Sequence, residues 1–131
     1  MKYLLDTVVW LWSVGPTEKI GAAGQEILSR GDEVIYLSAA SVWEIAIKAR
    51  SGKFHFPEEP ARYIPDRLAK QGIRGLPVSQ THALKVYDLD LHHNDPFDRM
   101  IIAQAIVEDL TVLTSDRLFG KYPIEVVWCG K

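Results

Sequence analysis

Short apolar runs that alternate with helical stretches are the feature that most limits how this 131-residue chain can fold. The runs KYLLD, EVIYLS and TVLTSD each have the length and composition of a buried strand. The shorter runs IRGLPV and IEVVW are expected to extend the same sheet. Strands that alternate with helices predict a three-layer α/β/α fold with a central, mainly parallel sheet.

Periodic stretches between these runs predict the helices. They cover residues 7–13, 18–31, 40–52, 61–72, 79–89 and 96–109, and Gly31 and Gly52 are expected to end two of them. Either Ser38 or Ser41 is expected to begin the third helix. The chain has the length of a single domain, residues 1–131, and its 47% of hydrophobic residues is enough for one core.

The segment DPFDRMIIAQA, residues 95–105, begins with two acids three positions apart. Asp95 followed by Pro96 is typical of a helix start, with the acid as N-cap and the proline as the first helical residue. Asp98 would follow at the third position, where a carboxylate reaches the cap or benefits from the helix dipole. The sequence is apolar nearly all round from Met100 to Val107, which predicts a buried helix.

Four acids are expected at one edge of the sheet. Asp6 ends the first strand, Glu44 lies early in the helix after the second, Asp98 starts its helix and Asp116 ends the strand TVLTSD. Each has a local explanation: Asp6 could cap a helix, Glu44 could form a capping box with Ser41, and Asp116 could lie in a turn. Local capping does not require all four to share an edge, and ligands bind at that edge in such folds.

A cluster of carboxylates needs a counter-charge. Two carboxylates about 4 Å apart repel by roughly 4 kcal/mol at an effective dielectric near 20. A divalent cation removes this cost, and all-oxygen ligation suits Mg²⁺ or Mn²⁺. Such ions activate water and stabilise the leaving oxygen, so the pattern predicts cleavage of phosphodiesters.

The segments LLDT, SVWEIAIK, DPFDRMIIAQA and LTSD, in this order, resemble the PIN-domain family, and specifically VapC-type toxins of toxin–antitoxin pairs. The resemblance covers essentially the whole chain. It implies a Mg²⁺- or Mn²⁺-dependent endoribonuclease that forms a homodimer and is inhibited by a VapB-type antitoxin. The family's acids correspond to Asp6, Glu44, Asp98 and Asp116.

From this resemblance we expect Asp6, Glu44 and Asp98 to hold the principal metal ion. Asp116 would assist a second ion or position the attacking water. Thr7 and Ser115 would orient neighbouring groups. Asp95 is interpreted chiefly as a helix cap, with a direct metal role as the alternative.

The overall charge of −2 excludes a strongly basic nucleic-acid binder, so contacts to RNA must be local. Arg99 could contact RNA or pair with an acid, and the other candidates, which are otherwise solvated surface, are Lys48, Arg50, Lys53, Arg117 and Lys121. His92 and His93 could act as bases, but a metal-activated water needs none, and a structural role is the simpler interpretation. The early tryptophans could fill the core or anchor an interface.

Neither export nor membrane insertion is expected. The apolar opening is interrupted by Asp6 and is too short to span a bilayer. The single cysteine, Cys129, has no partner and is expected to be buried, which agrees with a reducing cytoplasm.

Three other functions compete with a toxin nuclease. A phosphotransferase of the haloacid dehalogenase type would need a second aspartate where this chain has Val8. A receiver module would need an acidic pair at the first strand and an acceptor aspartate after a middle strand. A PIN-domain protein that processes or binds RNA without being a toxin would have the same site, and the sequence leaves this alternative open.

Overall fold

The computed structural model describes residues 1–130 and confirms the predicted parallel sheet. Its five strands lie in the order β3-β2-β1-β4-β5, and all four neighbouring pairs are parallel. The strands are β1 (Lys2–Leu5), β2 (Val34–Ser38), β3 (Arg74–Leu76), β4 (Thr111–Thr114) and β5 (Val126–Trp128).

The helices also follow the predicted order. They are α1 (Thr7–Ser13), α2 (Ala22–Arg30), α3 (Ala39–Arg50), α4 (Pro60–Gln71), α5 (Gln80–Lys85) and α6 (Pro96–Glu108), with 3₁₀ turns η1 (Thr17–Lys19), η2 (Val86–Asp88) and η3 (Arg117–Lys121). The stretch predicted as one helix over 18–31 divides into η1 and α2. The division falls at Gly21, whose extended backbone makes it the N-cap of α2. The prediction over 79–89 likewise divides into α5 and η2.

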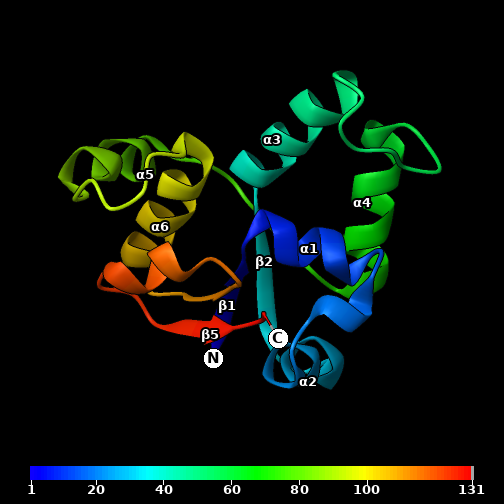
Figure 1. Cartoon of the computed structure of the whole chain (residues 1–131), viewed down its shortest axis with the longest axis horizontal. Helices are drawn as coiled ribbons and strands as arrows, with labels where there is room; N and C mark the ends of the chain where they lie inside the picture. The colour runs from blue at the N-terminus through cyan, green and yellow to red at the C-terminus, as the bar shows by residue number, and fades with distance from the viewer. Residues whose placement is uncertain (131) are drawn as a thin grey trace.

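Each face of the sheet carries its own core, because successive side chains of a strand point to opposite faces. Leu5 and Leu37 pack with Trp10 and Ile45 on one face. Leu4 and Val112 pack with residues of α6 on the other, among them the fully buried Ile101 and Ile102. Figure 1 shows α5 and α6 on one side of the strands and α1 and α4 on the other. This arrangement is the three-layer α/β/α architecture expected from the sequence.

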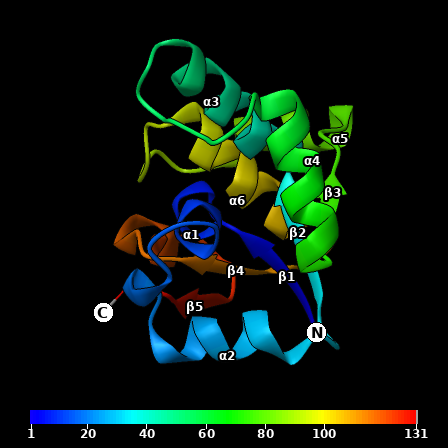
Figure 2. The ribbon, with the colours of Figure 1, turned by 90° about the vertical axis from the view of Figure 1, so that its right-hand side faces the viewer.

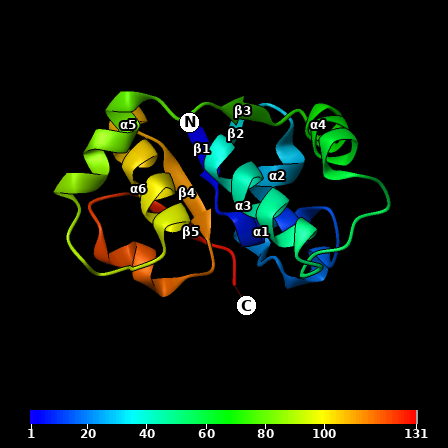
Figure 3. The same ribbon diagram turned by 90° about the horizontal axis from the view of Figure 1, so that it is seen from above.

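The direction of the chain across the sheet reverses at β1. From β1 the chain passes to β2 and β3 on one side, and later to β4 and β5 on the other. Figure 2 shows β1, β4 and β5 between α2 and α6, and Figure 3 shows α6 and α3 on either side of β1. Open α/β sheets bind ligands beyond the carboxyl ends of the strands at such a reversal. The predicted acids Asp6 and Asp116 follow the two strands that meet there.

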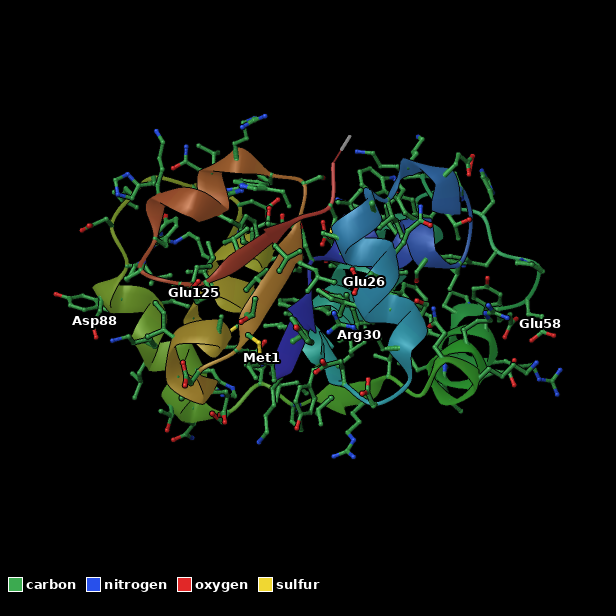
Figure 4. The ribbon with its side chains drawn as sticks, turned by 90° about the horizontal axis from the view of Figure 1, so that it is seen from below. Met1, Glu26, Arg30, Glu58, Asp88 and Glu125 are labelled. Carbon is green, nitrogen blue, oxygen red and sulfur yellow. The ribbon has the colours of Figure 1, made fainter. Side chains whose placement is uncertain are left out.

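Surface ion pairs lie at the amino ends of the strands, on the side of the sheet opposite to the predicted acids. Arg30 bonds Glu26 at 2.8 Å and Glu33 at 3.1 Å, and the amino group of Met1 lies 3.4 Å from Glu33. Figure 4 shows Met1, Glu26 and Arg30 on this underside of the molecule. Among residues 1–130, no helix has the length and hydropathy needed to cross a bilayer.

Candidate active site

A cavity of about 320 Å³ lies beyond the carboxyl ends of β1 and β4, and it brings together the four acids predicted from the sequence. Asp6 and Glu44 are buried, whereas the side chains of Asp98 and Asp116 are 17% and 33% exposed. The other polar residues of its lining are Thr7, Lys48 and Asp95. The acids come from four separate elements, so only the tertiary fold makes them neighbours.

Asp6 occupies the N-cap position of α1, but its carboxylate makes no capping hydrogen bond. Its Oδ2 instead accepts a hydrogen bond of 2.7 Å from the hydroxyl of Thr114 on β4. Burial, opposed in part by that hydrogen bond and reinforced by the charges of Asp116 and Glu44, raises the pKa of Asp6 from 3.8 to about 6. Capping therefore does not explain this residue.

Glu44 is also free of the capping role that the sequence allowed. Ser38 caps α3 by accepting a hydrogen bond from the N–H of Ala40. Ser41 accepts a hydrogen bond of 2.8 Å from the hydroxyl of Thr7, between α3 and α1. The carboxylate of Glu44 enters the cavity, where its Oε2 lies 2.6 Å from Nζ of Lys48. Its Oε1 is buried without a hydrogen-bond partner among residues 1–130. A buried carboxylate oxygen with no hydrogen-bond donor is suited to bind a cation.

Asp95 caps helix α6, whereas Asp98 lines the cavity, so each residue has one of the two roles that the sequence left open. Oδ1 of Asp95 accepts the backbone N–H groups of Phe97 and Asp98, at 2.8 and 3.2 Å, which confirms it as the N-cap of α6. The N–H of Asp95 bonds His93 and not Asp98, so Asp98 closes no capping box. Its carboxylate, fixed in the first turn, lines the cavity.

His93 links the last two acids, and the sequence analysis did not assign it to the site. Its Nε2 lies 2.8 Å from Oδ2 of Asp116 and 3.1 Å from Oδ2 of Asp98. Its Nδ1 accepts the N–H of Asp95, so the proton of the neutral ring is on Nε2. His93 therefore donates to the carboxylates and orients them. The sequence had raised His93 only as a possible base or a structural residue, and its place two residues before the cap Asp95 was the signal for its position here.

The pKa of Asp98 is raised further than that of Asp6. Burial, followed by the charges of Asp6, Asp95 and Glu44, raises the pKa of Asp98 from 3.8 to about 8. One oxygen of Asp98 and one of Asp116 lie within 4.8 Å of each other, a spacing that metal ligands show. The donors of the cavity are likewise carboxylate oxygens, the ligands that Mg²⁺ and Mn²⁺ prefer. The residues thus fit a divalent cation.

Arg99 makes hydrogen bonds within the protein, and a contact of this residue to RNA stays a prediction. Its guanidinium donates to the carbonyl oxygens of Val86, Leu89, Asp90 and His93 at 3.0 to 3.3 Å. These bonds hold the segment that leads from η2 to the cap of α6. Because the donors are engaged inside the protein, Arg99 supports the site by positioning His93 and the start of α6.

Thr7 and Ser115 are the two residues that the sequence predicted to orient neighbouring groups of the site. Thr7 joins α1 to α3 through Ser41, as a neighbour of Asp6. Thr114, and not Ser115, supplies the hydroxyl that holds Asp6, and its Oγ1 also accepts the N–H of Asp116. Any role of Ser115 remains a prediction.

Burial confirms the core interpretation for Trp10, whereas an interface role for Trp43 stays a prediction. Trp10 is fully buried in the core, whereas Trp43 is 64% exposed and packs edge to face against Phe97. Cys129 is buried, as expected.

Comparisons with known proteins agree with this geometry. A model of the PIN domain matches residues 3–125. Ribonuclease VapC16 of Mycobacterium tuberculosis is 52% identical over 48 residues, which are 37% of this chain and 34% of that protein. The match thus spans about a third of that relative's length.

Solved structures share the fold over almost the whole chain. VapBC2 from Rickettsia felis, bound to a DNA fragment from its promoter, superposes with a TM-score of 0.76 at 17% identity, over 98% of this chain and 99% of the other. DNA-bound VapBC from Salmonella typhimurium gives 0.72 at 17% identity, with 97% of both chains covered. FitAcB from Neisseria gonorrhoeae gives 0.66 at 22% identity, with 95% of both covered.

Proposed function

This chain belongs to the PIN domain family, and we propose that it is a metal-dependent endoribonuclease that hydrolyses RNA phosphodiester bonds. The observation that carries the proposal is the convergence of Asp6, Glu44, Asp98 and Asp116 on one cavity at the reversal of the sheet. The similarity to Ribonuclease VapC16 over 48 residues supports RNA as the substrate.

The four carboxylates would hold Mg²⁺, with Mn²⁺ able to replace it. When bound, such an ion lowers the pKa of a water molecule, orients it and stabilises negative charge on the phosphodiester. Glu44 offers a free buried oxygen, and Asp6 and Asp98 are acids whose raised pKa values return toward normal when a cation is near.

The chain's own residues prepare these ligands. Thr114 fixes one oxygen of Asp6, and Nε2–H of His93 fixes Asp116 and Asp98 with respect to one another. Asp98 lies in the first turn of α6, where the positive end of the helix dipole acts against the burial and neighbouring charges that raise its pKa. Pre-oriented ligands lose little conformational entropy on binding the ion.

The test is cleavage of total cellular RNA by the purified protein with Mg²⁺ or Mn²⁺, beside an EDTA control. Asp98→Asn removes a ligand charge, and Asp66→Asn is the matched control because Asp66 is an exposed acid of α4. Discrete fragments that require both metal and Asp98, and that persist in Asp66→Asn, are expected. Absence of cleavage by a folded, metal-binding protein would refute the nuclease and favour the alternative, a PIN-domain protein that binds RNA.

We further propose that the chain is the toxin of a VapBC-type pair, acting in the cytoplasm as a homodimer that a VapB-type antitoxin inhibits. The support is the likeness of its fold to chains of the two VapBC structures. A small DNA-binding protein encoded next to this chain should co-purify with it and abolish cleavage. If that neighbour neither binds nor inhibits, the chain is an RNA-processing PIN protein instead.

A further inference from the structure

Lys48 is the one basic side chain that lines the acid cavity among residues 1–130. It lies one helical turn after Glu44 on α3, and its Nζ is 2.6 Å from Oε2 of that carboxylate. The side chain of Glu44 is 8% exposed and that of Lys48 is 32% exposed. The ammonium therefore reaches from the cavity mouth to a buried acid.

The surroundings of Lys48 differ from those of an ordinary surface lysine. Hydrogen bonding to Glu44 outweighs partial burial and, with the charges of Glu44, Asp95 and Asp98, raises the pKa of Lys48. The ring of Phe54 also lines the cavity, and its centroid lies 5.8 Å from Nζ of Lys48. Lys48 thus supplies the only positive side chain against the five carboxyl groups of the lining, among the residues described.

A divalent cation and the ammonium of Lys48 would compete for the same carboxylate. Glu44 has two oxygens: one is buried without a partner and the other is held by Lys48. A metal ion bound through Glu44 places two positive centres on one carboxylate, which repel at such short range. The long, flexible stem of lysine allows its head group to leave Glu44 while remaining near the cavity mouth.

We propose that Lys48 is the resident counter-ion of the cavity, that a divalent cation displaces it from Glu44, and that the displaced ammonium then binds a phosphate of the RNA. This inference rests on the proposed nuclease function and adds a residue to it. An RNA phosphate meets the freed ammonium at the partly exposed mouth, next to the carboxylates. Lys48 would thus exchange one anionic partner for another as the site is loaded.

The first experiment measures Mn²⁺ affinity by calorimetry for the wild type, Lys48→Met and Lys70→Met. Lys70→Met is the matched control because Lys70 forms the same (i, i+4) pair with Asp66, at 3.1 Å, but on an exposed face. Loss of the competing charge should tighten Mn²⁺ binding by Lys48→Met about tenfold or more, with Lys70→Met unchanged. A lysine that only supports the helix would not strengthen metal binding when removed, so unchanged or weaker binding overturns the proposal.

The second experiment measures binding of a single-stranded RNA oligonucleotide in Ca²⁺ as a function of salt. Loss of one phosphate contact should lower the slope of log affinity against log salt by about 0.7 in Lys48→Met. Lys48→Arg keeps the charge and should retain most of the RNA affinity. A slope equal to that of Lys70→Met would overturn the phosphate role.

The two failures can be told apart. Neither measurement depends on cleavage, so an absence of RNA cleavage by the wild type would refute the nuclease without deciding the role of Lys48. If Lys48→Met does not fold, as judged by circular dichroism, Lys48→Gln takes its place in both titrations. Tighter Mn²⁺ binding together with a reduced salt slope supports the exchange of partners.

Discussion

The buried acid Asp6 should make the metal-free protein less stable as the pH rises. Burial and neighbouring charge raise its pKa from 3.8 to about 6 in the folded state. Between these values the folded state binds more protons than the unfolded state, so the free energy of unfolding falls with increasing pH. Above about pH 6 both states are ionised and the contribution of Asp6 levels off.

The size of this effect follows from the pKa change. A rise from 3.8 to about 6 covers about two pH units, each worth about 1.4 kcal/mol, which gives a limit of about 3 kcal/mol. Part of this loss of stability has already occurred at pH 4, because about half of the Asp6 carboxyl groups are ionised at that pH in the unfolded chain. Between pH 4 and pH 7.5 we therefore expect a loss of about 2–3 kcal/mol from this residue.

Asp6→Asn isolates the effect from that of the other acids. The asparagine oxygen can still accept the hydrogen bond from Thr114, but it carries no charge. Urea unfolding in EDTA, followed by tryptophan fluorescence, should show the variant gaining about 2–3 kcal/mol relative to the wild type between pH 4 and pH 7.5. Asp66→Asn, at an exposed position, should show no such gain.

Metal ions should offset this loss of stability in the wild type at pH 7.5. At a Mn²⁺ concentration of 100 times its dissociation constant, binding stabilises the wild type by about 2.7 kcal/mol. Asp6→Asn, with a ligand charge removed, should gain much less. A difference between variant and wild type that stays constant from pH 4 to pH 7.5 would refute this account of the cavity.

Two further predictions concern the start of α6. Asp95→Asn should keep both stability and metal affinity, because asparagine is an equally good N-cap, whereas Asp95→Ala should lose about 1 kcal/mol in urea unfolding; loss of Mn²⁺ binding in Asp95→Asn would instead make Asp95 a ligand. Arg99→Ala leaves four carbonyl oxygens without their donor and should cost about 2–4 kcal/mol in the same assay. The folded fraction of that variant should bind RNA as the wild type does, and a selective loss of RNA affinity would contradict the structural role.

Local sequence determined the elements of this protein and their order. The strand runs and helical stretches carry their periodicity within a few residues, so five strands and six helices could be predicted together with their parallel arrangement. The main errors lie at Gly21, where extended backbone interrupts a predicted helix, and after Lys85, where the α-helix continues as a 3₁₀ helix. Asp95 as the cap of α6 was predictable for the same reason, since its partners Phe97 and Asp98 are its neighbours in the chain.

Tertiary structure decided what the acids do. Asp6 and Thr114 are 108 residues apart and meet only because β1 and β4 are neighbours in the sheet. His93 and Asp116 are 23 residues apart, with α6 and β4 between them, and Arg99 donates to carbonyl oxygens of an earlier segment. Sequence patterns report propensities over a few residues, whereas these contacts depend on which strands pair and where the chain reverses. The residue types of the site were therefore readable in the sequence, but their partners and protonation were set by the fold.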